Sequence, residues 1–315
     1  METNMGTRTE TRTEARTETN MGTNKDINKD ANKQKKVRFI ADSSCDMKEA
    51  DYENLVTVPL TISTEKESWV DEKLDINQML NVLEAYKGRS YTACPGPESW
   101  IKAFEGADTV YVATLTSGLS GTYNSAMAAK ELFCKEHPEV RIHVFDTLTT
   151  AAELRLFMEK LMELDSQGNS FEEVCKKAQD YLKKTRLLFS LKSLHNFAQN
   201  GRVSKALASA VGVLGISIIG IASEEGTLQP IEKSRGDKRV VAKLTEQLRK
   251  LSYNGGKLRI SHVQNEALAE QIKDAVKKLY PKADVLVYGA RGLCSYYAER
   301  GAVLLGCETE QPSHS

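Results

Sequence analysis

A glycine-rich turn at residues 116–122 has the clearest chemical potential in the sequence. It reads Thr-Ser-Gly-Leu-Ser-Gly-Thr and stands between an apolar run and a segment of helical composition. Gly118 and Gly121 allow a backbone to approach a ligand closely, and a helix start offers unpaired N–H groups and the positive end of its dipole. Ser117 and Ser120 add hydroxyl donors. The turn therefore predicts a cradle for a small anion, either a carboxylate or a phosphate.

The turn also admits two other interpretations. Ser120 or Thr122 could simply cap the helix by accepting a hydrogen bond from a backbone N–H. Ser120 could also be a nucleophile, but Gly-Leu-Ser-Gly matches the Gly-x-Ser-x-Gly elbow of hydrolases only in part. A serine nucleophile needs a base, and no histidine is near it in the sequence. A hydrolase or phosphotransferase that acts through Ser120 stays open as the alternative to anion binding.

A second candidate is Thr92, which precedes a proline-stiffened loop. In α/β sheets such loops meet at the strand ends where ligands usually bind, although a threonine that merely flanks a helix fits as well. Cys94 beside it is a conceivable thiol nucleophile, but a partly buried structural cysteine is the better interpretation. Two polar clusters, 200–205 and 234–239, are either solvated turns or a basic face that docks a partner or closes over an anion.

The elements that must position these residues follow from the apolar pattern. Short runs of aliphatic residues predict buried strands, and the segments between them predict helices. This alternation predicts an α/β fold with two α/β domains and mainly parallel sheets, and Glu224-Glu225-Gly226 predicts a hairpin turn in the second half. The expected strands are 37–42, 55–63, 110–115, 141–146, 187–191, 258–263 and 284–290, and the expected helices include 76–85, 123–136, 192–215, 237–251 and 265–279.

The domain organisation is expected to have three parts. Residues 1–36 contain near-repeats such as TRTETRTEARTE with almost nothing apolar, which predicts a disordered tail. The ordered part is expected to divide near residue 183 into an N-terminal α/β domain, 37–183, and a C-terminal α/β domain, 184–310. The loops expected to bind the anion fall in the first domain.

The bulk composition excludes several classes of function. The 43 basic and 43 acidic residues balance, so nucleic acid and a strongly anionic membrane surface are poor partners. The longest apolar stretch, 206–222, is shorter than the ~20 residues of a spanning helix and is broken by glycines. The six cysteines and five histidines are scattered, which predicts reduced thiols and no metal site. With no secretory signal, we expect a cytoplasmic protein that is not inserted in a membrane.

Six blocks in the same order resemble the DegV family, and the resemblance covers nearly all of 37–308. The block at 115–123 is similar almost residue for residue to the family's Leu-Ser-Ser-Gly-Leu-Ser-Gly-Thr-Tyr. The six blocks are Asp-Ser-Ser-Cys-Asp at 42–46, Val-Pro-Leu at 58–60, Thr-Ala-Cys-Pro at 92–95, Leu-Thr-Ser-Gly-Leu-Ser-Gly-Thr-Tyr at 115–123, Gly-Arg-Val-Ser-Lys at 201–205 and Lys-Ser-Arg-Gly at 233–236.

This resemblance implies a protein without catalysis or cofactor that holds one long-chain fatty acid non-covalently at the junction of its two domains. It also implies a partner, a fatty acid kinase, to which the carboxylate is presented. The family's Gly-Thr-His-x-Gly-Pro-Gly segment corresponds to 294–301, and its histidine to Tyr297, whose hydroxyl can also donate a hydrogen bond. The residues implied for the carboxylate are Thr92, Ser120, Ser117, Gly121 and Tyr297, and those for partner docking are Arg202, Lys205 and Arg235.

The physics of an acyl chain suits a carrier. Burial contributes about 0.8 kcal/mol per methylene, so fourteen methylenes supply roughly 11 kcal/mol before binding costs. The apolar run 207–221 and residues 187–191 could supply the surroundings of the chain, although most of them are expected to be ordinary core. The carboxylate needs hydrogen-bond donors because an unpaired buried charge is costly. A regulatory or scaffold protein that binds its partner through Arg202 and the turn 233–239 is a further alternative.

Overall fold

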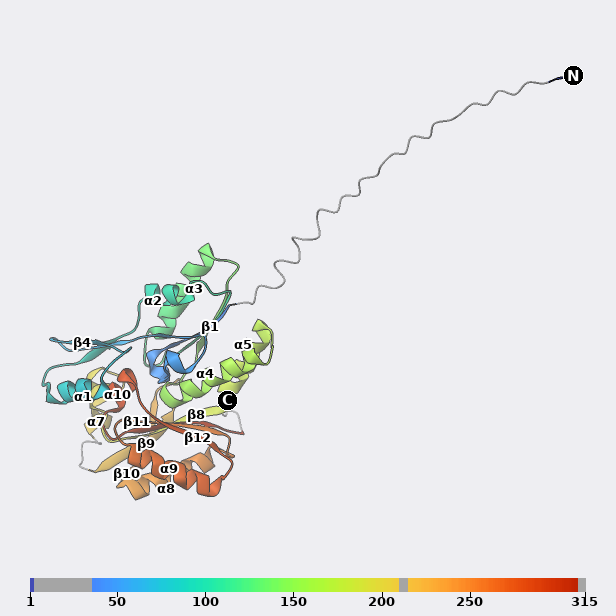
Figure 1. Cartoon of the computed structure of the whole chain (residues 1–315). Coiled ribbons are helices and arrows are strands. Elements are labelled where there is room, and N and C mark those ends of the chain that lie inside the picture. The colour runs from blue at the N-terminus through green and yellow to red at the C-terminus, as the bar shows by residue number, and fades with distance from the viewer. Residues whose placement is uncertain (3–35, 210–214, 311–315) are drawn as a thin grey trace. The chain divides into compact units, whose positions relative to one another are not determined.

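Four parallel strands form the first sheet, in the order β2-β1-β6-β7 (Figure 1). The computed structural model describes residues 1–2, 36–209 and 215–310. Residues 3–35 of the expected tail 1–36 therefore lie outside the described residues. The parallel arrangement predicted from the sequence is confirmed in this sheet. Its strands are β1 (Val37–Asp42), β2 (Leu55–Val58), β6 (Thr109–Thr114) and β7 (Arg141–Asp146).

Helices cover both faces of this sheet, so its strands are apolar on both sides. Along β6, Val110 and Val112 pack beneath α2 and α3, whereas Tyr111 and Ala113 pack beneath α4 and α5. The alternation follows from the period of two in a strand. The helices are α2 (Pro97–Phe104), α3 (Thr122–Glu136), α4 (Ala151–Ser166) and α5 (Phe171–Leu182).

The second sheet has six strands in the order β10-β9-β8-β13-β11-β12. Four of its five strand pairings are antiparallel, and only β11 and β12 pair in parallel. The predicted mainly parallel arrangement is therefore wrong for this sheet. β13, which the sequence pattern did not reveal, runs against both β8 and β11, and β9 runs against both β8 and β10. The strands are β8 (Thr185–Leu191), β9 (Ile216–Ala222), β10 (Leu228–Arg235), β11 (Lys257–His262), β12 (Asp284–Gly289) and β13 (Val303–Glu308).

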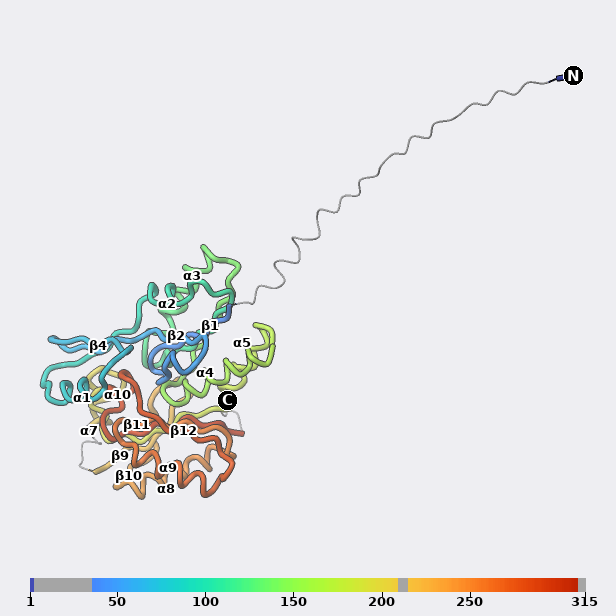
Figure 2. Tube along the Cα trace, viewed as in Figure 1, coloured from blue at the N-terminus to red at the C-terminus, as the bar shows by residue number. Residues whose placement is uncertain are grey.

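The predicted hairpin is confirmed as β9 and β10. Its turn closes with a hydrogen bond of 2.8 Å from the Ser223 N–H to the Thr227 carbonyl, and Gly226 adopts a φ of 71°. Two helices, α8 (Asp237–Lys250) and α9 (Glu266–Leu279), pack on one face of the second sheet. In Figures 1 and 2 they lie on the side away from α4, which runs between the two sheets.

A small antiparallel sheet, β4-β3-β5, completes the sheets of the described residues. The single strand predicted over 55–63 is broken at Pro59, which has no N–H to donate to a sheet; β2 ends before it and β3 begins after Leu60. The helical segments expected over 192–215 are two short helices, and 210–214 lie outside the described residues. The remaining elements are β3 (Thr61–Ser63), β4 (Ser68–Val70), β5 (Tyr91–Ala93), α1 (Ile76–Ala85), α6 (His195–Gln199), α7 (Lys205–Ser209), α10 (Gly292–Ala298) and the 3-10 turns Ser43–Cys45 and Glu49–Asp51.

The predicted domain boundary near residue 183 falls between α5 and β8. Residues 36–315 form one compact unit by their contacts, so a division at 183 stays a prediction. None of the helices in the described parts of the chain has the length and apolar character needed to cross a bilayer.

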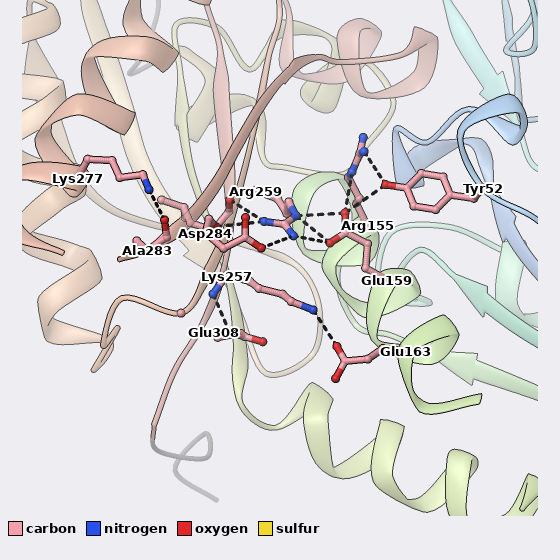
Figure 3. Close-up of polar contacts among 12 residues, drawn as sticks. Tyr52, Arg155, Glu159, Glu163, Lys257, Arg259, Lys277, Ala283, Asp284 and Glu308 are labelled. Atoms are coloured by element: carbon pink, nitrogen blue, oxygen red, sulfur yellow. Dashed lines mark hydrogen bonds and ion pairs between the residues drawn. The ribbon is translucent and has the colours of Figure 1, made fainter. Parts of the chain in front are cut away.

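A buried ionic network joins α4 to the second sheet (Figure 3). The guanidinium of Arg259, on β11, donates from Nε to both carboxylate oxygens of Glu159 on α4, at 3.1 and 2.8 Å. Its Nη2 lies 3.0 Å from the Asp284 carboxylate of β12. Arg155 also donates to Glu159, at 3.1 Å, and to the Tyr52 hydroxyl at 2.8 Å. The side chains of Arg259 and Glu159 are only 7% and 12% exposed, so these two charges depend on each other for compensation.

We expect Glu159→Gln to destabilise the protein by about 3 kcal/mol, because breaking a buried pair leaves an uncompensated charge. Chemical denaturation measures the loss. The matched control is Glu270→Gln, which removes an exposed pair with Lys273 and is expected to change stability little. Equal effects of the two substitutions would show that the network does not hold α4 to the second sheet.

Candidate functional site

A cavity lies where the first sheet, the second sheet and α10 meet. Its free space, open mouth included, is about 800 Å³. Leu187, Phe189 and Leu191 alternate along β8 and face the cavity, while Leu188 packs with α8 and α9 on the other face. The apolar wall is completed by Leu60, Leu115, Leu119, Ala151, Phe197, Ala222, Leu228, Leu293, Ala298 and Leu304.

The polar part of the wall is almost entirely hydroxyl groups. Arg202 is the one charged residue among the described residues of the wall, and its Nε donates to the Leu119 carbonyl at 3.1 Å. A carboxylate placed here would find hydroxyl donors and a single positive charge. The hydroxyl-bearing residues of the wall are Thr92, Thr116, Ser120, Thr149, Thr150, Thr227 and Tyr297.

Two of the predicted site residues are in direct contact. The Thr92 hydroxyl, on β5, lies 2.7 Å from the Tyr297 hydroxyl on α10. The Tyr297 ring contacts the rings of Phe197 and Tyr296, with both centroid distances 4.9 Å. In such a pair one hydroxyl donates to the other, which leaves one hydrogen free for a ligand. The structure thus brings together Thr92 and Tyr297, which are 205 residues apart.

The glycine-rich turn contributes Ser120 to the wall but not all of its neighbours. The Ser120 hydroxyl lies 2.8 Å from that of Thr122 and accepts the Thr122 N–H at 3.4 Å, so it helps to satisfy the start of α3 while also facing the cavity. Ser117 is exposed, and its N–H donates to Asp146 at 3.0 Å. Neither Ser117 nor Gly121 lines the cavity.

Gly118 makes room for protein rather than for a ligand. A Cβ at this position would lie 2.3 Å from the Glu225 carbonyl, and one at Gly226 would lie 2.0 Å from the Thr116 hydroxyl. The tip of the β9–β10 hairpin therefore packs directly on the glycine-rich turn, and Gly226 and Thr227 join the wall. The sequence predicted that Gly118 lets the backbone approach a ligand. In the structure Gly118 instead makes room for the hairpin.

The docking residues predicted from the sequence are spread over three elements. Arg202 lies in the cavity wall, Lys205 is exposed at the start of α7, and Arg235 is exposed at the end of β10. The sequence predicted that the segment with Arg202 either docks a partner or closes over an anion. Arg202 lies in the cavity wall.

The wall lacks the groups that a serine enzyme needs. No histidine, lysine, aspartate or glutamate lines the cavity among the described residues, so Ser120 has no base within the wall. Burial raises the pKa of the Cys294 thiol well above its ordinary value, which leaves it protonated and unreactive. Cys94 is exposed, not partly buried as expected. The described residues also contain no group of three or more side chains suited to hold a metal ion.

Three buried aspartates, Asp42, Asp46 and Asp71, form a cluster that the sequence pattern did not reveal. Burial raises the pKa of Asp42 to about 6 and that of Asp46 to about 7, and it also raises the pKa of Asp71. Asp42 accepts the Leu115 N–H at 2.6 Å and Asp46 accepts the Arg291 N–H at 2.7 Å. The sequence pattern indicated only a turn and a family likeness for the block at 42–46. Two aspartates at the end of a buried strand were the signal that could have found it.

Comparison with known proteins places these observations in a family. The DegV family model, described as "Uncharacterised protein, DegV family", matches residues 36–310. A DegV domain-containing protein of Streptococcus pneumoniae is 40% identical over 278 residues, which cover 87% of this chain and 99% of the relative.

Two solved structures share the fold at high identity. A DegV family protein from Eubacterium eligens, loaded with heptadecanoic acid, is 53% identical with a TM-score of 0.85, and the match covers 87% of this chain and 100% of that one. The Fatty Acid Kinase (Fak) B3 protein of Streptococcus pneumoniae, loaded with linoleic acid, is 40% identical with a TM-score of 0.86 over the same shares. These similarities confirm the α/β fold class and the family likeness expected from the sequence blocks.

We expect the Asp46 carboxyl to lower the free energy of unfolding as the pH rises. Its folded pKa of about 7 is above its unfolded value, so its contribution is fully present below the unfolded pKa and is lost as the pH rises through about 7. The groups around it are Asp71, Arg291 and Cys294. We expect the melting temperature of Asp46→Asn relative to wild type to increase from pH 4.5 to pH 8, by at least roughly 2 °C.

Calorimetry at matched ionic strength measures this trend. The control is Asp180→Asn, whose exposed carboxylate pairs with Lys183 and should not show the increase. A difference between Asp46→Asn and wild type that stays constant over this pH range would contradict the assignment.

Proposed function

The chain belongs to the DegV family, and on that premise we propose that it binds one long-chain fatty acid non-covalently and performs no chemistry on it. The observation that carries this proposal is the cavity itself, an apolar space with hydroxyl groups and one arginine in its wall. The Eubacterium eligens and Streptococcus pneumoniae relatives, loaded with heptadecanoic and linoleic acid, support a fatty acid as the ligand class.

We assign the carboxylate to the hydroxyl end of the cavity. Thr92, Ser120 and Tyr297 are placed to donate to its oxygens, and Arg202 to offset its charge. The start of α3 adds the positive end of a helix dipole. Ser117 and Gly121, which lie beside this end but outside the wall, belong to the proposal as flanking residues. The tail would extend along β8 and α10, where burial of each methylene contributes about 0.8 kcal/mol.

Tyr297 stands where the family resemblance implies a histidine. A tyrosine hydroxyl donates one hydrogen bond and brings no positive charge. Because its hydrogen-bond partner Thr92 is also uncharged, the head group would be held by neutral donors together with Arg202.

We further propose that the protein presents the carboxylate to a fatty acid kinase in the cytoplasm. One structural relative is named as a Fatty Acid Kinase B3 protein, and all six cysteines are free thiols, which suits a reducing compartment. Arg235 and Lys205, which are exposed, are the proposed docking residues, with Arg202 at the cavity.

Removing two head-group donors should weaken binding. We expect Thr92→Val with Ser120→Ala to lower the affinity for palmitate by at least about 100-fold, since each of the two hydrogen bonds to a charged group contributes about 1.5–3 kcal/mol. Displacement of a fluorescent fatty acid measures the affinity. The control pairs Thr61→Val on β3 with Ser99→Ala on α2, neither of which lines the cavity. Unchanged affinity in the double variant would remove the proposed head-group site.

Loss of Arg235 should affect the partner and not the lipid. We expect Arg235→Ala to lower kinase-dependent formation of acyl phosphate by at least about fivefold, because docking relies on surface charge, while palmitate affinity stays within twofold. Lys282→Ala is the matched control, because Lys282 is exposed and precedes β12 at the opposite edge of the sheet. Wild-type rates of acyl phosphate formation in Arg235→Ala would exclude this docking face.

A further inference from the structure

We propose that Asp71 is a positioning residue for the head-group site, because it holds the amino end of α10 and thereby sets Tyr297 opposite Thr92. This inference rests on the proposed function, since it concerns how the same site is held in shape.

The carboxylate of Asp71 closes the first turn of α10. One oxygen accepts the Gly292 N–H at 2.9 Å and the other accepts the Leu293 N–H at 2.8 Å. The first N–H groups of a helix have no partner within it, and the side chain of the preceding Arg291 makes no capping hydrogen bond. Asp71 is 1% exposed, so water does not substitute for it. The cap comes from a residue about 220 positions earlier in the chain.

Gly292 is required for this contact. A Cβ there would lie 2.6 Å from Oδ1 of Asp71 and 2.9 Å from its Cγ, distances that real Cβ atoms essentially do not adopt. Any larger residue would push the carboxylate and the helix start apart. The glycine and the aspartate therefore form one unit.

Arg291 braces the same unit from the other side. Its N–H donates to Asp46 at 2.7 Å, and its guanidinium donates to the carbonyls of Asp71, at 2.8 Å, and of Met47. The amino end of α10 is thus tied to the segments 46–47 and 71–72 of the first half of the chain.

The opposite end of α10 is also fixed. The Tyr296 hydroxyl lies 2.8 Å from that of Ser90 and accepts from Asn200 at 2.9 Å. Tyr297 is five residues past Gly292, or about 7.5 Å along the helix, and its hydroxyl meets Thr92 in the cavity wall. A helix of two turns held at both ends leaves Tyr297 little freedom, so a loosened first turn would move the hydroxyl away from Thr92.

The test compares two ligands that share a tail. We expect Asp71→Asn to lower the affinity for palmitic acid by about tenfold and that for hexadecanol by less than threefold, because hydrogen bonds to a charged group are worth more than those to a neutral one. Gly292→Ala should give the same pattern and provides a second variant if Asp71→Asn folds poorly. Asp75→Asn, which removes the charge from an exposed cap on α1, is the control and should change neither affinity.

A double-mutant cycle separates positioning from general weakening. If Asp71 acts through Tyr297, Asp71→Asn should cost no further affinity for palmitic acid in a Tyr297→Phe background. Equal losses of affinity for the acid and the alcohol would overturn the inference, and so would an unchanged loss in the Tyr297→Phe background. If the wild-type protein still binds palmitic acid, the proposed function is unaffected by that result. A wild-type protein that binds neither ligand would remove the proposed function itself.

Discussion

A carboxylate cannot be buried beside a hydrocarbon tail unless hydrogen-bond donors replace the water it loses. The cavity meets this constraint by separating its wall into two kinds of surface. Aliphatic residues of β8, β13 and α10 form one part, and Thr92, Ser120 and Tyr297, with Arg202, form the other. Because no acidic side chain lines the wall among the described residues, nothing there competes with the ligand for these donors. The rest of the fold fixes the position of the two surfaces relative to each other.

The relative position of the two surfaces depends on contacts between distant parts of the chain. Thr92 lies on β5 of the small sheet, in the first half of the chain, whereas Tyr297 belongs to a short helix near the C-terminal end of the chain. Two polar systems connect the halves: the ionic network on α4 in Figure 3 and the aspartates that hold the amino end of α10. The first joins α4 to the second sheet, and the second fixes the helix that carries Tyr297. Burial of these charges costs free energy, so their role is better understood as specifying geometry than as adding stability.

Local patterns predicted what local physics controls. The four parallel strands, the hairpin at 224–226 and the turn at 116–122 were all predicted, because periodicity and turn residues determine them. The assignment of Thr92 and Tyr297 to one site followed only from family resemblance, and their contact was not predicted, since no local signal links residues so far apart. β13 and α10 were missed because their placement depends on long-range pairing, and Gly118 was assigned to a ligand because a sequence cannot show that the hairpin tip packs there.

A crystal structure of the protein with palmitate bound tests the central claim most directly. The account predicts a carboxylate oxygen within hydrogen-bond distance of Thr92 and Ser120, near Tyr297, with the tail running along β8 and α10. A fatty acid bound with its tail end at these hydroxyls, or outside the cavity, would contradict it.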